Sequence, residues 1–137
     1  MRRLVAASIA MAVVFAIAGC GGDETSLDGT NWTLETIDSG TASSPAIEGT
    51  EPTLVFAGTM VSGSDGCNQL SGSVTVGPDD AMSFGPLAST QMACEQPVMD
   101  QASAIGEILA GVGTYTIDGS TLTLTAGDGS RLIYTAG

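Results

Sequence analysis

The sequence predicts an α+β fold, a mainly antiparallel and strongly curved β-sheet with one packed α-helix. Three observations lead to this prediction. Short segments rich in β-branched residues alternate with glycine and aspartate turns along most of the chain. One stretch, residues 97–112, instead repeats apolar residues at helical spacing. The last segments are separated by short glycine turns, which favour antiparallel neighbours.

The predicted strands of the first half follow one another closely. Residues 30–37 alternate in polarity and place Trp32 and Leu34 on one face, as a half-buried strand does. Residues 39–51 have the composition of a loop. Gly72 lies in the apolar phase of its strand and indicates a bulge or a close backbone approach. Further strands are predicted at residues 52–57, 60–62, 70–76 and 82–84, with a tight corner at 62–68 and a turn at 77–80.

One helix is predicted to begin near Pro97, because proline suits the first helical turn. Gly111 and Gly113 are expected to end it. Its apolar stripe consists of Val98, Ala102, Ile105, Leu109 and Val112. Strands are then predicted at residues 114–117, 121–125 and 132–135, joined by turns at residues 118–119 and 127–129.

Residues 1–19 have the pattern of a lipoprotein signal peptide. Arg2 and Arg3 precede an apolar run at residues 4–18, which is shorter than the roughly 20 residues that a membrane-spanning helix needs. Residues 17–20 (IAGC) resemble a lipobox, in which small residues precede the cysteine that receives lipid. We therefore expect cleavage before Cys20 and lipid on its thiol. The alternatives are an ordinary signal peptide with a chance cysteine and a retained transmembrane anchor.

The charge of the mature chain bears on how it reaches a membrane. After cleavage, Arg131 is the one basic side chain against fifteen acidic ones, and the chain has no histidine. Nucleic acid and anionic headgroups should repel such a surface. Lipid on Cys20 must then hold the protein, with residues 20–26 as a polar tether, at the extracytoplasmic face of the cell membrane. Two or three acyl chains make this attachment stable, since each buried methylene contributes about 0.8 kcal/mol.

The three cysteines divide between lipid and fold. Assigning Cys20 to lipid leaves Cys67 and Cys94 as an even pair, and a disulfide is chemically allowed outside the cytoplasm. Two buried reduced thiols are the alternative. A redox pair is less favoured because the two cysteines form no C-x-x-C motif. With no histidine and two free cysteines, no metal site or cofactor is expected.

Five segments carry a family resemblance through their order and spacing along the chain. They are residues 27–32 (LDGTNW), 54–56 (LVF), 61–68 (VSGSDGCN), 87–94 (LASTQMAC) with the helix after it, and 122–124 (LTL). Together they resemble the META domain, the fold of the HslJ-like bacterial lipoproteins, over residues 27–136. Gln91 departs from the resemblance, since the family often has a basic residue at that position. The domain is accordingly placed at residues 27–137.

This resemblance implies a non-catalytic module of the bacterial cell envelope that is linked to stress tolerance. No catalytic residues carry over, and no enzyme activity is expected. The alternative is an envelope enzyme that uses carboxylates in an unrecognised site, because acid and base chemistry without histidine would fall to Asp or Glu. Ser62, Ser64 and Ser89 have no histidine or lysine partner to activate them.

Candidate contact residues are few. The Asp-Gly pairs at residues 65–66, 118–119 and 128–129 are more simply turns than calcium ligands. Asn31, Asn68, Gln69 and the loop at 39–51 are polar positions that could face an envelope protein or a small ligand, although such residues more often form turns. The identity of that partner does not follow from the sequence.

Overall fold

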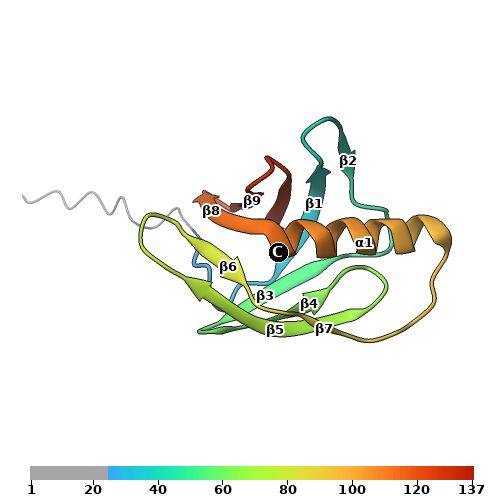
Figure 1. Ribbon diagram of the computed structural model, residues 1–137, viewed down its shortest axis with the longest axis horizontal. Helices are drawn as coiled ribbons and strands as arrows, with labels where there is room; N and C mark the ends of the chain where they lie inside the picture. The colour runs from blue at the N-terminus through green and yellow to red at the C-terminus, as the bar shows by residue number, and fades with distance from the viewer. Residues whose placement is uncertain (1–24) are drawn as a thin grey trace, which may run out of the picture.

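The computed structural model describes residues 25–137, so the predicted signal peptide, Cys20 and residues up to 24 of the tether lie outside the described residues (Figure 1). Ten strands and one helix follow in the order β1 (Trp32–Asp38), β2 (Ser43–Pro45), β3 (Thr53–Ala57), β4 (Met60–Ser64), β5 (Gln69–Val76), β6 (Met82–Phe84), β7 (Ala88–Ser89), α1 (Gln96–Gly111), β8 (Val112–Asp118), β9 (Thr121–Ala126) and β10 (Arg131–Ala136).

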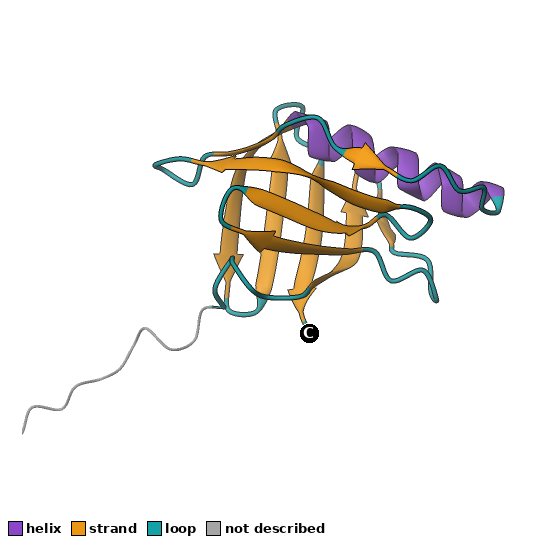
Figure 2. Ribbon diagram, turned by 90° about the horizontal axis from the view of Figure 1, so that it is seen from below, coloured by secondary structure: helices purple, strands orange, loops and turns teal. Residues whose placement is uncertain are grey.

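The strands form one curved antiparallel sheet in the order β6-β5-β4-β3-β1-β10-β9-β8, with β2 paired to β1 and β7 paired to β5. Figure 2 shows two groups of strands that cross steeply, with α1 lying along one rim. The two ends of the sheet meet at a bridge between Ala81 and Thr114. The backbone amide of Tyr115 also donates to the carbonyl of Asp80, at 3.0 Å. The sheet is therefore a nearly closed barrel, and the predicted α+β class is confirmed.

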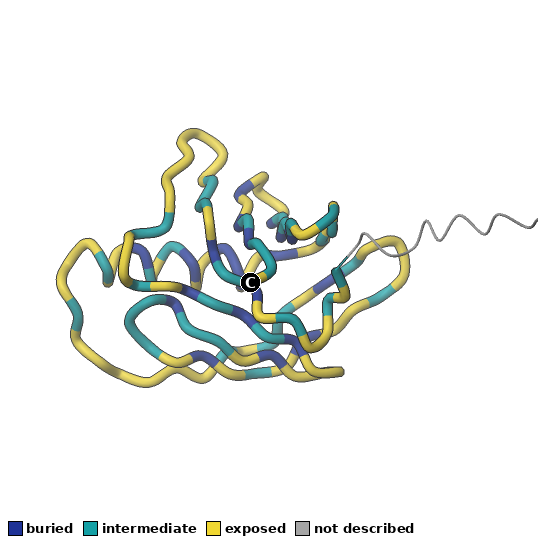
Figure 3. The backbone as a smooth tube through the Cα atoms, turned by 180° about the vertical axis from the view of Figure 1, so that it is seen from behind, coloured by how far each residue is buried: buried dark blue, intermediate teal, exposed yellow. Residues whose placement is uncertain are grey.

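The core fills the inside of this barrel. Alternate residues of the longer strands point inward, as the period of a pleated strand requires, whereas every residue of the short strands β2 and β7 is exposed. Exposed positions also occupy many of the turns between strands (Figure 3). Trp32, predicted to be a core residue, is fully buried, and its indole Nε1 donates to the Leu27 carbonyl at 3.1 Å. Tyr134 is also fully buried, and burial raises the pKa of its phenol far above the ordinary value.

The helix α1 packs on β6, β9 and β10 with one face. Ile105 and Leu109 of the predicted stripe are fully buried there, and Ile108 joins them. Gln101 is buried on the same face, which the apolar stripe did not predict. Each fully buried aliphatic side chain of this kind stabilises the fold by about 1.5–3 kcal/mol, so the helix is held by packing more than by its own propensity.

Three segments differ in secondary structure from what was predicted. The segment at 39–51 contains the short strand β2, which pairs with Thr36–Asp38 of β1 although its composition is that of a loop. Residues 63 and 64 belong to β4, because Thr53 and Leu54 of β3 pair with them. Val112 begins β8 and does not end the helix, since its backbone is already extended. In each case pairing with a neighbouring strand outweighs local composition.

Candidate functional site

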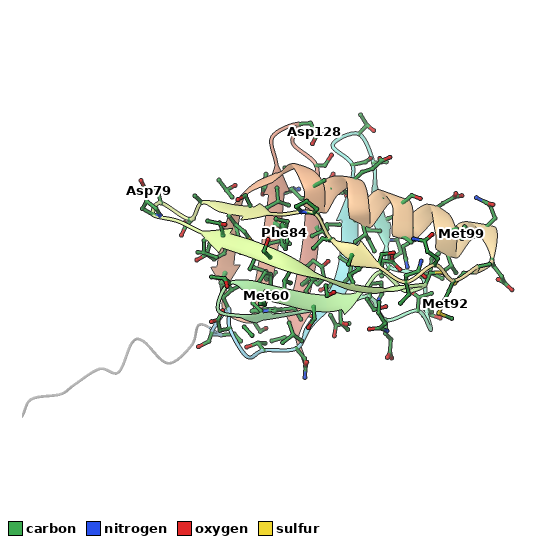
Figure 4. All side chains as sticks on the ribbon, turned by 60° about the horizontal axis from the view of Figure 1, so that its bottom comes forward. Met60, Asp79, Phe84, Met92, Met99 and Asp128 are labelled. Atoms are coloured by element: carbon green, nitrogen blue, oxygen red, sulfur yellow. A yellow bond between two sulfur atoms is a disulfide. The ribbon has the colours of Figure 1, made fainter. Side chains whose placement is uncertain are left out.

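A groove with a volume of about 630 Å³ lies between α1 and the chain that runs from β6 through β7. Its lining is mostly apolar, with Leu70, Phe84 and Leu87 on the strand side and Met99 and Ala102 on the helix side. At the end near the start of α1 the lining becomes polar. In Figure 4, Phe84 lies beside the C-terminal part of α1, whereas Met92 and Met99 lie near the start of the helix.

Apart from Met99 near the start of α1, the helix wall of the groove consists of small side chains. Ala102, Ser103, Gly106 and Ala110 lie at spacings of one to four residues and line the groove on a flank of α1 turned away from the core. A Cβ atom added at Gly106 would meet no atom within 4 Å. The groove is therefore open because large side chains are lacking on this flank, and a larger residue at 106 would fill it.

The strand wall contains a bulge. The amide of Gly85 donates to Ser73, and Ser71 pairs with Ala88, so both Pro86 and Leu87 lie opposite the single residue Gly72. A Cβ atom at Gly72 would come 2.7 Å from Leu87 Cδ2 and 2.9 Å from the Pro86 carbonyl oxygen. The predicted close backbone approach at Gly72 is thus confirmed, and it shapes the floor of the groove.

The polar end of the groove is fastened by a disulfide between Cys67 and Cys94, as predicted. Their Cα atoms are 6.0 Å apart, and the bond spans 27 residues of sequence. Cys67 lies in the corner between β4 and β5, whereas Cys94 precedes α1. The bond therefore joins the start of the helix to the strand side of the groove.

Asn68 and Asp65 reinforce this fastening with their side chains. Asn68 Oδ1 accepts hydrogen bonds from the Met92 amide at 2.7 Å and from the Thr90 hydroxyl at 3.1 Å. Asp65 Oδ1 accepts from the amides of Cys67 at 2.9 Å and Asn68 at 2.6 Å. The two motifs that carry the family resemblance, at 61–68 and 87–94, are thus bound to each other. Asn68, predicted as a contact residue, lines the groove but commits its carbonyl oxygen to the fold.

Gln101 ties a third segment to the same corner. Its Oε1 accepts from the Ile47 amide at 2.8 Å, and its Nε2 donates to Thr50 Oγ1 at 3.1 Å. Gly66 has a φ of +94°, and a Cβ atom there would come 2.8 Å from Gln101 Nε2. Sequence reasoning missed Gln101; its one signal is a polar residue placed within the apolar phase of the helix.

The other predicted contact residues lie outside the groove. Asn31 is exposed, and its carbonyl accepts from the Gly137 amide at 3.0 Å. Gln69 lines a shallower hollow of about 280 Å³ on β5 and β7. Of residues 39–51, Ile47 and Thr50 contact Gln101, and none lines the groove. The structure therefore brings Asn68 to the groove and leaves the remaining predictions apart from it.

The carboxylates of residues 25–137 are scattered. Asp65 is the one buried acid among them, and within that range no three His, Cys, Asp or Glu side chains gather to hold a metal ion. At the turn of residues 127–129, Asp128 Oδ1 accepts from the Ser130 amide at 2.9 Å, and this bond lowers the pKa of the carboxyl. Arg131 pairs with Asp38, 2.6 Å from Nη2 to Oδ2.

Comparison with known proteins supports the resemblance. The sequence model of the META domain matches residues 25–136. No curated protein matches the chain. The NMR structure of a protein from Burkholderia xenovorans is 24% identical, with a TM-score of 0.71 over 81% of this chain and 83% of that one. A second NMR structure is 25% identical, with a TM-score of 0.61 over 77% of this chain and 87% of that one.

A crystal structure of a DUF4847 family protein from Bacteroides vulgatus has the same fold at 10% identity. Its TM-score is 0.61, over 80% of this chain and 93% of that one. In the part of the chain that the structure describes, no helix has the length and apolar character to cross a membrane.

Proposed function

Since the chain belongs to the META domain family, we propose that it is an exported, lipid-anchored protein of the bacterial cell envelope whose domain is a non-catalytic binding module. The groove beside α1 carries this proposal. Its volume of about 630 Å³ lies within the range of about 300–1,000 Å³ that is usual for ligand sites. Its lining combines apolar side chains with polar groups that gather mainly at one end, a combination that suits a ligand site.

The residues that line the groove suit ligand binding better than catalysis. Asp65 is its one titratable acid, and Asp65 Oδ1 is occupied by two backbone amides. Carboxylate catalysis calls for two acids placed together, and the other acids of residues 25–137 are not buried. Met92 and Met99 are 60% and 41% exposed near the polar end. Methionine adapts its shape to varied partners, which suits a binding surface.

Export and lipid attachment rest on two features. The Cys67–Cys94 disulfide fits an oxidising compartment outside the cytoplasm. The lipobox pattern at residues 17–20 supplies the expected attachment site at Cys20. Together they favour a domain held at the extracytoplasmic face of the membrane, where it meets an envelope protein or a small ligand and contributes to stress tolerance.

Complementation of a deletion strain under envelope stress tests this proposal. We expect wild-type protein and Gly106→Ala to restore growth, whereas Gly106→Leu, which fills the groove, should not. Cys20→Ala should move the protein out of the membrane fraction and lose protection as well. Full protection by Gly106→Leu at normal protein levels would contradict the binding role, and membrane retention of Cys20→Ala after alkaline washing would contradict the anchor.

A further inference from the structure

The polar end of the groove contains a buried carboxylate with one oxygen unused. Asp65 lines the groove and is only 5% exposed. Its Oδ1 accepts from the amides of Cys67 and Asn68, whereas its Oδ2 accepts no hydrogen bond from residues 25–137. Tyr134 Oη is the one fully buried side-chain nitrogen or oxygen without a partner in that range, so Asp65 Oδ2 retains contact with solvent.

The packing around this corner leaves the groove as the open side of Asp65. On the other side, Gln101 Nε2 donates to the Asp65 carbonyl at 3.5 Å. Thr50 lies against Gly66, where an added Cβ atom would come 2.9 Å from Thr50 Cβ. The 46–50 loop and α1 therefore cover the corner there. The access that Asp65 Oδ2 retains is from the groove that this residue lines.

No cation of the described chain neutralises this carboxylate. Arg131 is the one basic side chain of residues 25–137, and it pairs with Asp38 on β1. Over the same residues, no cluster of three His, Cys, Asp or Glu side chains is present that could hold a metal ion at Asp65. A buried charge without a counter-charge is costly, and two amide hydrogen bonds offset only part of that cost. A positively charged group on a ligand would offset more of it.

The rest of the groove calls for an apolar body attached to that charged group. The helix wall runs from Met99 to Ala110, which is about 16 Å at the rise of an α-helix. Gly106 leaves space along this wall, since a Cβ atom there would meet nothing within 4 Å. Met99 lies near the start of α1, and Phe84 lies beside its C-terminal part (Figure 4). The groove thus connects an acidic end to an apolar end.

We propose that the groove binds a small amphiphilic amine, with its ammonium group at Asp65 and its apolar body along α1 toward Phe84. An ammonium group donates a charge-assisted hydrogen bond to Oδ2 and supplies the missing counter-charge. A fatty acid would instead bring a second negative charge to Asp65, and the exposed Glu95 and Asp100 near the start of α1 would repel it further. A second copy of this acidic chain is disfavoured for the same reason. This inference rests on the proposed binding function and names its ligand class.

The test compares three straight-chain amphiphiles of equal length, decylammonium, decanol and decanoate, each below the concentration at which it forms micelles. Each is titrated into the isotope-labelled mature chain carrying Cys20→Ser, which removes the lipid, and binding is followed by NMR. We expect decylammonium to bind at least about tenfold more tightly than decanol, because both fill the apolar part and only the amine pairs with Asp65. Decanoate should bind more weakly than decanol.

Variants of the protein assign this preference to Asp65. Asp65→Asn keeps an oxygen acceptor for the two amides and removes the charge, so decylammonium affinity should fall at least about tenfold while decanol affinity changes less than about twofold. Asp100→Asn makes the same charge change at an exposed site outside the groove and should change decylammonium affinity less than about threefold. Gly106→Leu should weaken both decylammonium and decanol, which keeps the test decisive if Asp65→Asn does not fold.

The orientation of the bound amine gives an independent readout. Intermolecular NOEs should connect the methylene next to the nitrogen with the Met99 methyl group, and the terminal methyl group of the ligand with the Phe84 ring. The reverse orientation would place the ammonium group in the apolar part and would overturn the assignment to Asp65.

Other results would also overturn the inference. They are equal affinities for decanoate and decylammonium, an unchanged decylammonium affinity in Asp65→Asn, and no binding of any of the three amphiphiles. Tighter binding of a capped Leu-Val-Lys peptide than of decylammonium would assign the groove to a protein partner instead. In each case the proposed function stands if Gly106→Leu still loses stress protection in cells, whereas full protection by that variant contradicts the proposed function itself.

Discussion

Leu87 occupies the space above Gly72, with Leu87 Cδ2 only 2.7 Å from where a Cβ atom of residue 72 would stand. The contact exists because the bulge at Pro86 and Leu87 brings two residues over one. It joins the floor of the groove to the barrel wall. A strand glycine that looks weak by propensity is thus required by close packing.

Gly72→Ala should therefore destabilise the protein by about 1–3 kcal/mol, the usual range for overpacking, since the Pro86 carbonyl oxygen is backbone and cannot turn aside. Urea unfolding measures this change in the free energy of unfolding. Gly113→Ala is the matched control, because a Cβ atom there meets nothing within 4 Å. Equal midpoints for the two variants would show that the close approach has no energetic weight.

The sequence predicted the fold more completely than it predicted the groove. Periodicity located α1 and the three last strands to within a few residues, because each buries alternate or helically spaced apolar side chains in a local pattern. The burial of the Trp32 and Leu34 side chains was likewise predicted from the alternation of apolar and polar residues. Gly72 was singled out because glycine in an apolar phase is unexplained by burial alone.

The groove escaped prediction because it depends on contacts between distant segments. Its helix wall is open because the residues at Gly106 and Ala110 are small. Small residues add nothing to the apolar periodicity of the sequence, so the pattern does not reveal the groove. Strand β2 was missed since its exposed residues follow no alternation, and only pairing with β1 orders them. Gln101 was missed because its partner, Ile47, lies 54 positions earlier in the sequence.

Gln101→Leu should lower the free energy of unfolding by about 1–3 kcal/mol, because it leaves the part-buried Ile47 amide without an acceptor. The comparison is Gln96→Leu on the same helix, where the side chain is exposed and bonds to Asp100 across one turn. Thermal unfolding of both variants provides the measurement. A larger loss at residue 96 than at 101 would mean that the Gln101 network does not hold the 46–50 loop.

Removing the disulfide by Cys67→Ser with Cys94→Ser should destabilise the fold by about 3–4 kcal/mol, from the entropy that a closed loop of this length removes from the unfolded chain. Differential scanning calorimetry measures the change. The single variant Cys67→Ser serves as control and should lose at least as much. Two alkylatable thiols in unreduced wild-type protein would show instead that the bond does not form in solution.

Tyr134→Phe should leave stability unchanged or raise it by up to about 1 kcal/mol. Within residues 25–137 the buried Tyr134 hydroxyl has no hydrogen-bond partner, so its removal relieves an unmet desolvation penalty and keeps the ring. Chemical unfolding gives the sign. Tyr115→Phe at a half-buried site is the control. A loss above about 1 kcal/mol at residue 134 would indicate that the hydroxyl is bonded in solution.

Arg131→Ala should raise the pKa of Asp38, which is held below its ordinary value chiefly by the hydrogen bond from Arg131 and next by the Gly40 amide. A lowered carboxyl pKa stabilises the fold above the unfolded-state value of about 3.9, and this contribution is lost as the pH falls through the folded-state value. Carboxyl-carbon NMR titration from pH 2 to 7 gives the pKa directly.

The pKa of Asp38 should stay somewhat below its ordinary value in the variant, because the Gly40 amide still donates to the carboxylate. The pKa of Asp128 should not change and serves as the internal control. An unchanged Asp38 titration would mean that the ion pair between β1 and β10 does not persist in water, as exposed pairs sometimes do not.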